Sequence, residues 1–317
     1  MNKSFLITGG AGYIGTALTR RLLDQGAQIT VFDNLVTGRR DLVDPRARFV
    51  MGDVLSYVDL SLLCANNNFD TIIHLAALKS VGDSETAPRD FMNVNVSGTL
   101  NILEMMKENQ IYSLVFSSTA AVYKENSAGV YDEDCALSPM SIYGSTKLIC
   151  EELIRQYERL GHIRHGIIFR YFNLAGDSGL NFLDRFAQNV FPMIARACLD
   201  NHAFSIFGDD FPTPDGTGIR DYIHLNDLVE AHVLGMNQNV SGVFNLGTQD
   251  GTSVMDLVER FNNQLTAPLK VQVVARRPGD VAKAIANPSK AKRAFNWVAK
   301  SSIDEMVTST IKAYHVK

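Results

Sequence analysis

The strongest constraint on the fold is an alternation of short apolar runs with amphipathic stretches through the first half of the chain. The runs have the length of strands, and the stretches between them carry apolar residues at helical spacing. In chain order they fall at 5–7, 14–25, 29–32, 48–50, 59–66, 71–75, 92–109, 114–117, 143–160 and 167–170. Parallel strands need such helical crossovers. The sequence therefore predicts an α/β fold with a doubly wound parallel sheet.

The alternation ends near Asn173, where segments rich in Gly, Asp and Pro begin, notably 208–216. Such segments are typical of loops with short strands and helices between them. We expect residues 1–172, with a returning segment near 218–247, to form a nucleotide-binding domain. Residues 173–217 and 248–317 are expected to form a smaller mixed α/β substrate domain.

Composition excludes several classes of function. The formal net charge is -4, and no basic run is longer than a pair of arginines, so nothing indicates binding to nucleic acid or to an anionic membrane. No stretch approaches the roughly 18 apolar residues that span a bilayer. The four cysteines are scattered, without metal-ligand spacing, which favours free thiols, no metal and a cytoplasmic location.

A glycine-rich loop follows the first predicted strand and opens the first predicted helix. Gly9, Gly12 and Gly15 are spaced three apart, which lets backbone N–H groups and the helix N-terminus approach a pyrophosphate. A structural glycine turn is the alternative interpretation. Asp33 ends the second predicted strand, where a carboxylate accepts hydrogen bonds from the adenosine ribose and repels a 2′-phosphate. The pair of features predicts a Rossmann-type site for NAD.

Two further segments follow predicted strands. Asp53 is suited to bind the adenine amino group, although a cap on the next turn is an equally simple role. His74, Leu75, Ala76 and Ala77 offer a wall of small residues along which a dinucleotide can lie. We interpret His74 itself as a structural histidine, because no metal partners accompany it at ligand spacing.

Tyr143 and Lys147 lie four residues apart on a predicted helix, and therefore on one face. A tyrosine has an ordinary pKa of about 10, and a neighbouring ammonium stabilises its phenolate, so the pair can act as a base. Ser117, Ser118 and Thr119 end a buried strand, where a hydroxyl can polarise the same substrate oxygen. Capping of the next turn is the alternative role for Ser117 and Ser118.

These motifs and others resemble the UDP-glucose 4-epimerase family of extended short-chain dehydrogenases. The resemblance runs almost end to end, in the family's order and spacing. Its segments are TGGAGYIG at 8–15, Asp33-Asn34, Gly52-Asp53, HLAALKSVGDS at 74–84, NVSGTL at 95–100, SSTAAVY at 117–123, YGSTK at 143–147, RYFN at 170–173, GTGIRDYIH at 216–224 and RRPGD at 276–280.

The resemblance implies roles for individual residues. Tyr143 is the base, Lys147 holds the nicotinamide ribose and lowers the pKa of Tyr143, and Thr119 is the hydroxyl partner. The implied cofactor contacts are Gly9, Gly12, Tyr13, Ile14, Gly15, Asp33, Asn34, Asp53, Val54, Leu75, Ala76, Ala77, Lys79, Asn95, Ser117, Tyr143, Lys147 and Tyr171. The implied substrate contacts are Lys79, Thr119, Tyr143, Asn173, Asn189, Phe207, Arg220, Arg277, Asp280 and Ala284. Paired guanidinium groups are also what a diphosphate requires on chemical grounds.

The expected reaction interconverts UDP-glucose and UDP-galactose through a transient 4-keto sugar, with NAD retained. Ala284 stands where the family associates a bulky aromatic residue with exclusion of an N-acetyl group, so UDP-GlcNAc and UDP-GalNAc are expected substrates as well.

Several alternatives remain within and outside the fold. A 4,6-dehydratase requires an acidic pair beside Thr119, but Ala120 and Ala121 follow it. A 4-reductase would exchange its cofactor with solvent, and a UDP-uronic acid or UDP-pentose epimerase would differ in the sugar pocket. A non-catalytic NAD-sensing protein is the alternative from another class, and the intact Tyr143, Lys147 and Thr119 argue against it.

The resemblance also implies a homodimer, formed by pairing of the helices at 92–109 and 143–160. These helices carry apolar residues beyond one face, which indicates burial on two sides. The residues concerned are Leu100, Leu103, Met106, Leu148, Leu153, Tyr157 and Leu160. Ordinary packing within one chain is the alternative.

Overall fold

The computed structural model describes residues 3–65, 67–182, 187–238, 240–277 and 279–315. The chain forms two units. Unit 1 comprises Met1–Val122, Leu137–Arg170 and Val229–Phe244, and unit 2 comprises Tyr123–Ala136, Tyr171–Leu228 and Asn245–Lys317. Among the described residues, no helix is both long and apolar enough to cross a membrane.

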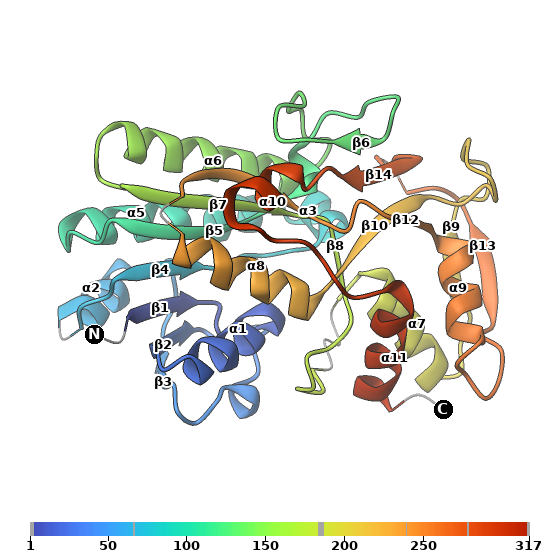
Figure 1. Cartoon of the computed structure of the whole chain (residues 1–317), viewed down its shortest axis with the longest axis horizontal. Coiled ribbons are helices and arrows are strands. Elements are labelled where there is room, and N and C mark those ends of the chain that lie inside the picture. The colour runs from blue at the N-terminus through green and yellow to red at the C-terminus, as the bar shows by residue number, and fades with distance from the viewer. Residues whose placement is uncertain (1–2, 66, 183–186, 239, 278, 316–317) are drawn as a thin grey trace. The chain divides into compact units, whose positions relative to one another are not determined.

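A seven-stranded sheet in the order β11-β7-β5-β4-β1-β2-β3 organises unit 1 (Figure 1). Neighbouring strands from β3 to β5 pair in parallel, so the predicted doubly wound sheet is confirmed. The strand order reverses between β1 and β4, and ligands bind at such a switch point. The strands are β1 Ser4–Thr8, β2 Gln28–Asp33, β3 Arg48–Met51, β4 Thr71–His74, β5 Ser113–Thr119, β7 His165–Tyr171 and β11 Gly242–Leu246.

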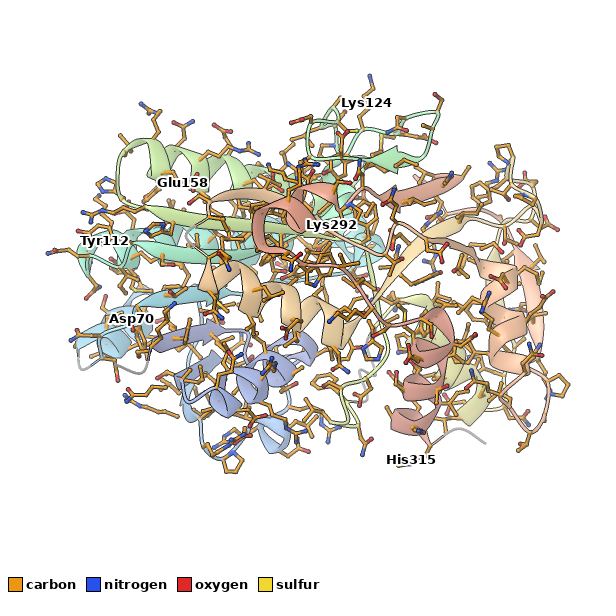
Figure 2. The ribbon with its side chains drawn as sticks, in the orientation of Figure 1. Asp70, Tyr112, Lys124, Glu158, Lys292 and His315 are labelled. Carbon is orange, nitrogen blue, oxygen red and sulfur yellow. The ribbon has the colours of Figure 1, made fainter. Side chains whose placement is uncertain are left out.

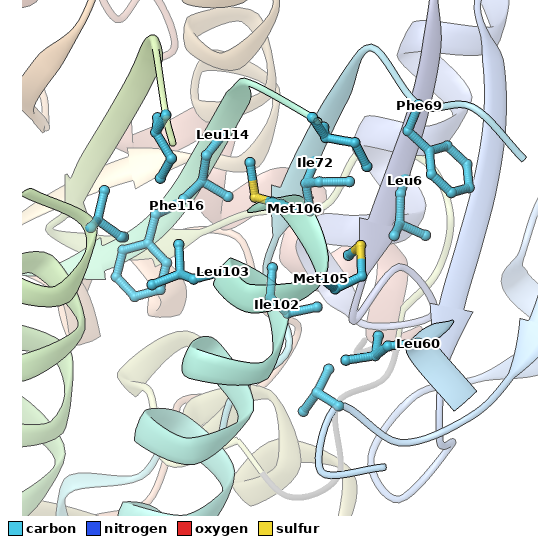
Figure 3. Packing of buried hydrophobic residues seen from close by; sticks show 14 of the residues in the cluster. Leu6, Leu60, Phe69, Ile72, Ile102, Leu103, Met105, Met106, Leu114 and Phe116 are labelled. Carbon is cyan, nitrogen blue, oxygen red and sulfur yellow. The ribbon is translucent and has the colours of Figure 1, made fainter. Parts of the chain in front are cut away.

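Helices cover both faces of this sheet because alternate strand residues are apolar on each side. Figure 3 shows one face, where Leu6, Ile72, Leu114 and Phe116 pack against Ile102 and Leu103 of α5 (Gly98–Glu108). Residues of α2 (Tyr57–Ala65) and α6 (Ile142–Arg159) complete the same core.

The other face carries α1 (Tyr13–Asp24) and α8 (Leu225–Asn237). These helices lie side by side, and Arg21 of α1 pairs with Glu230 of α8 at 3.0 Å (Figure 1). In α8, the His232 ring packs on Phe169 of β7 with centroids 4.7 Å apart. Both layers therefore hold the sheet whose strand ends carry the candidate residues.

The segment predicted as one helix over 92–109 has a different beginning. Short helices α3 (Val81–Thr86) and α4 (Pro88–Phe91) lead into a π-helix at Met92–Ser97, and only then does α5 begin. The π-turn places the Asn95 carbonyl where it accepts the Thr99 hydroxyl at 2.6 Å and the Cys150 thiol at 3.2 Å. A wider turn at this point is frequently associated with a functional site.

The carboxyl ends of the central strands meet at one edge of the sheet. Thr8 is paired with His74, and His74 with Phe116, so the segments that follow β1, β4 and β5 emerge together. At the opposite edge, the Asp70 carboxylate accepts a hydrogen bond of 2.7 Å from the Ser4 backbone at the start of β1 (Figure 2). Polar side chains with candidate chemistry gather at the first edge.

Unit 2 contains shorter strands and four helices among its described residues. A central path runs β12-β10-β14-β6, with β8 paired to β10, and β13 pairs β9 separately. Its core is made by side chains such as Phe191, Tyr222 and Phe261. The elements are β6 Val130–Tyr131, β8 Asn173–Ala175, α7 Val190–Leu199, β9 Phe204–Phe207, β10 Ile219–His224, β12 Gly251–Ser253, α9 Val254–Asn262, β13 Val271–Val274, β14 Lys283–Ala286, α10 Ser289–Phe295 and α11 Ile303–Tyr314.

Candidate functional site

The glycine loop joins β1 to α1 at the switch point of the sheet. Gly9 has φ +68, and a Cβ there would lie 2.7 Å from the backbone nitrogen of Ala76. A Cβ on Gly15 would lie 2.5 Å from the Cα of Gly10. Only glycine permits these two approaches, because the obstructing atoms are backbone. The loop therefore lies against the segment Leu75–Ala77. A single binding surface made of the loop and this segment requires that contact.

The amino end of α1 has no side-chain cap. Gly12 caps the helix without a side-chain hydrogen bond, and Tyr13, Ile14 and Gly15 form the first turn. The N–H groups of a first helical turn have no partners within the helix, and the helix dipole favours negative charge there. This arrangement fits the pyrophosphate of a dinucleotide.

Asp33 ends β2 beside the same loop and is 8% exposed. Its carboxylate accepts hydrogen bonds from Ala11 N at 3.0 Å and Leu35 N at 2.8 Å. Burial raises the pKa of Asp33, and these two backbone donors oppose the shift. The carboxylate thus anchors the glycine loop while it lies at the strand end where a ribose would be recognised.

Asn34 and Asp53 are brought together although they are distant in the sequence. The Asn34 amide donates to the Asp53 carboxylate at 3.0 Å, and the other Asp53 oxygen accepts from Leu55 N at 2.9 Å. The turn-capping interaction considered for Asp53 is therefore present. Val54, next in the chain, is buried.

Tyr143 lies in the first turn of α6, and Lys147 one turn later. The Ser141 side chain caps this helix by accepting from Gly144 N at 3.1 Å. A Cβ on Gly144 would lie 2.4 Å from the Ala121 carbonyl oxygen, so a glycine allows α6 to approach the segment after β5 closely. Capping and close packing together place the helix face against the end of β5.

Thr119, at the end of β5, forms a side-chain hydrogen bond with Tyr143. Lys147 Nζ donates to the Ser117 carbonyl at 2.8 Å and lies 4.8 Å from the centre of the Phe116 ring. The three predicted catalytic residues therefore form one cluster, in which the Thr119 hydroxyl and the Tyr143 phenol can bind the same substrate oxygen.

Burial dominates the titration of this cluster. It raises the pKa of Tyr143 to about 12, and the Thr119 hydrogen bond acts in the opposite direction. It lowers the pKa of Lys147 to about 8, against the influence of Cys150 and Glu151. The partly buried Tyr143 phenol and the buried Lys147 ammonium, one helical turn apart, are poised for proton transfer once another positive charge stabilises the phenolate.

Asn95, in the π-helix, is 2% exposed and supports the neighbouring loop. Its amide accepts from Leu78 N at 2.8 Å and donates to Leu78 O at 3.1 Å and to the Thr146 hydroxyl at 3.0 Å. Lys79 follows Leu78 and is exposed. The amide of Asn95 thus ties the segment that carries Lys79 to the helix that carries Tyr143.

A second group of predicted residues gathers in unit 2 around two guanidinium groups. Arg220 on β10 lies 3.7 Å from the Asp280 carboxylate. The Arg277 guanidinium stacks 3.7 Å from the centre of the Phe207 ring. Partial burial lowers the pKa of Arg277, the Asp280 charge opposes this shift and the Arg220 charge adds to it. Asp280 is the carboxylate that interacts with both guanidinium groups, so the cluster keeps a net positive charge, which suits a diphosphate.

Ala284 lies beside this cluster. It is paired with Arg220 across the parallel strands β10 and β14, and its methyl group is half-buried. Asn173, on β8, donates to the Asp221 carbonyl at 3.2 Å. Asn189 is the exposed residue that caps α7, and Tyr171 is buried at the end of β7.

Sequence reasoning missed Asp221, which is fully buried behind this cluster. Its carboxylate accepts from the backbone and hydroxyl of Thr248, both at 2.8 Å, from Gln249 N at 2.9 Å and from Ala286 N at 3.0 Å. These bonds hold β14, and with it Ala284, against β10. Its position directly after Arg220 in GTGIRDYIH was the available signal.

Comparison with known proteins identifies the family of this chain. The sequence profile of the NAD-dependent epimerase/dehydratase family matches residues 5–247. A UDP-glucose 4-epimerase of Corynebacterium glutamicum is 38% identical over 297 residues, covering 92% of this chain and 89% of that protein.

Two solved structures extend the comparison. UDP-glucose 4-epimerase of Bifidobacterium longum, in complex with NAD+ and UDP, has a TM-score of 0.93 at 32% identity, covering 99% of this chain and 98% of that one. The UDP-Glc/GlcNAc 4-epimerase of Campylobacter jejuni has a TM-score of 0.87 at 31% identity, covering 99% of each chain.

Proposed function

The chain belongs to the NAD-dependent epimerase/dehydratase family, and from this premise we propose that it interconverts UDP-glucose and UDP-galactose at C4. The observation that carries the proposal is the cluster of the partly buried Tyr143 and Thr119 with the buried Lys147, at the same carboxyl edge of the sheet as the glycine loop. This cluster joins one base to one hydroxyl donor, which is what reversible oxidation of a single alcohol requires.

When bound, NAD would supply the acceptor for a hydride from the sugar and the donor that gives it back. Tyr143 removes the proton from the sugar 4-hydroxyl, and Thr119 donates a hydrogen bond to the same oxygen. The resulting 4-keto sugar rotates within the site to present its opposite face, and Tyr143 then returns the proton. Lys147 supplies positive charge close to the phenolate and holds the nicotinamide ribose. The first turn of α1 would hold the pyrophosphate, and Asp33 would hold the adenosine ribose.

In this proposal unit 1 is the NAD-binding domain and unit 2 binds the UDP-sugar. Arg220 and Arg277 neutralise the diphosphate, Asp280 accepts from the uridine ribose, and Phe207 lies under the base. The support is the excess of positive charge at this cluster and the stacking of Arg277 on Phe207.

The direct test is to incubate the purified protein with UDP-galactose, without added cofactor, and to follow UDP-glucose by chromatography. We expect conversion to an equilibrium mixture, together with NAD that copurifies with the protein. A reductase would instead consume reduced cofactor in proportion to product. Repeated preparations that hold neither NAD nor NADH, and that convert nothing, would contradict the proposal.

We further propose that the enzyme accepts UDP-GlcNAc and UDP-GalNAc. Ala284 presents only a methyl group beside Arg220, and Asp221 holds its strand in place. Steady-state kinetics with both pairs of substrates tests this idea, and undetectable turnover of the acetylated pair would refute the open pocket while leaving the first proposal intact.

Assembly as a homodimer through α5 and α6 is proposed as well. Two of the apolar residues noted in the sequence, Leu103 and Met106, are buried in the chain's own core. Leu100 and Leu160 are 40% and 56% exposed, and they are the side chains a partner would cover. Sedimentation analysis of the wild type and of Leu160→Glu tests the dimer. The four free cysteines support a reducing, cytoplasmic location.

A further inference from the structure

Three side chains spaced four residues apart on α6 hold three consecutive residues of β5. The Tyr143 phenol forms a hydrogen bond with the Thr119 hydroxyl, and Lys147 donates a hydrogen bond to the Ser117 carbonyl at 2.8 Å. The third contact joins Glu151 to Ser118, whose hydroxyl donates to Oε1 at 2.5 Å. The first two pairs belong to the proposed chemistry, whereas Glu151 acts directly on that chemistry only through its charge, which opposes the lowering of the Lys147 pKa by burial.

Glu151 is also held from the opposite side, by Arg170 of the neighbouring strand β7. Arg170 Nε donates to Oε1 at 2.9 Å, and its terminal nitrogen donates to Oε2 at 2.6 Å. The two side chains are 0% and 1% exposed. Arg155, which is 37% exposed, adds an outer contact of 3.0 Å to Oε2. Both carboxylate oxygens therefore have directed donors, and α6 is tied to two adjacent strands.

Stability alone is a weak reason for such a pair. Removing two charges from water is unfavourable, and well-packed apolar residues often replace a buried ion pair without loss of stability. What the pair provides is direction, since a bidentate arginine and one hydroxyl allow the carboxylate a single position. That position sets how far α6 lies along β5.

We propose that Glu151 and Arg170 are positioning residues that hold α6 in register with β5, so that the Tyr143 oxygen stays beside the Thr119 hydroxyl. The inference rests on the proposed function. Glu151 reaches the proposed chemistry through Ser118 and through the effect of its charge on Lys147, so the expected effect of losing the pair lies in the chemical step. A displacement of about 1 Å at a reacting group can lower a rate on the order of 100-fold.

The test compares three variants with the wild type. Glu151→Met with Arg170→Met removes both charges together, so that neither is left buried alone. Ser118→Ala removes only the hydrogen bond between Glu151 and β5. Arg155→Met removes only the outer, exposed contact and is the matched control. Each protein is assayed for thermal unfolding, copurified NAD, kcat and KM with UDP-galactose, and hydrogen exchange over residues 142–150.

The double variant and Ser118→Ala are expected to fold and to hold NAD, with KM within about threefold of the wild type. Their kcat should fall by roughly 10- to 100-fold, and exchange over 142–150 should become faster. Arg155→Met should keep kcat within about twofold, as expected for an exposed ion pair. This pattern supports positioning, because a merely structural role would lower thermal stability without separating kcat from KM.

Wild-type kcat in a folded Ser118→Ala protein would overturn the inference, as would an equal loss of kcat in Arg155→Met. If the double variant does not fold, Ser118→Ala decides alone. If the wild type epimerises no UDP-sugar, the proposed function fails, and hydrogen exchange then judges the positioning role separately. Unchanged protection of 142–150 in Ser118→Ala would count against it.

Discussion

His74 lies in a directed chain of hydrogen bonds that fits a neutral ring. The Thr99 hydroxyl donates to the Asn95 carbonyl at 2.6 Å, so at 3.1 Å from His74 Nε2 it must accept. Nε2 therefore carries the ring proton, and Nδ1 accepts from the Thr8 hydroxyl at 2.7 Å. Protonation of Nδ1 would turn the Thr8 hydroxyl from donor to acceptor and place a positive charge in a fully buried site.

This environment makes the protein sensitive to acid. Burial, and secondarily the charge of Lys147, lower the pKa of His74 to about 3 from an ordinary 6.5. Below pH 6.5 the unfolded chain takes up a proton that the folded chain refuses, so folding stability falls as the pH falls, down to about pH 3. Above pH 6.5 the effect vanishes. At pH 5 the difference is about 1.5 pH units, or about 2 kcal/mol.

Urea unfolding of the wild type and of His74→Gln at pH 7, 6 and 5 measures this term. The variant is less stable at pH 7, because it loses hydrogen bonds, and its deficit should shrink by about 2 kcal/mol on going to pH 5. His165→Gln, at an exposed position, should keep the wild-type dependence on pH. Parallel curves for wild type and His74→Gln would refute the assignment of a buried neutral imidazole.

Three further predictions concern the site. Tyr143→Phe should lower kcat by about 100-fold or more while NAD still copurifies, and an unchanged rate would remove Tyr143 from the mechanism. Ala284→Tyr should lower kcat/KM for UDP-GlcNAc by more than about tenfold and leave UDP-glucose turnover nearly unchanged in the same assay. Gly9→Ala forces a Cβ to 2.7 Å from Ala76 N at φ +68, so it should lower the free energy of unfolding by about 1–3 kcal/mol and deplete copurified NAD, both measurable on purified protein.

Much of the fold and part of the site follow from local pattern. The alternation of strands and helices predicted the parallel sheet, because the hydrophobic period and the length of each element can be read from a short segment of sequence. In a parallel sheet, the residues at the carboxyl ends of β1, β4 and β5 must share an edge. The sequence alone therefore places Gly9, His74 and Thr119 at the same edge. The π-turn at Met92–Ser97 could not be predicted from the sequence. It depends on a contact across the core, in which the Asn95 carbonyl accepts the Cys150 thiol.

The same limit explains Glu151, whose neighbour Glu152 is chemically identical. Glu151 is fully buried and Glu152 is exposed, and the local sequence does not distinguish the two residues. Burial of Glu151 depends on Arg170, which lies nineteen positions away on strand β7. Helical geometry nevertheless held a clue, because Tyr143, Lys147 and Glu151 recur every four residues and must share one face. A carboxylate one turn beyond two chemically active residues faces the same buried strand, where it requires a partner. Extending a catalytic spacing by a further turn is therefore a physical way to search for the residues that support it.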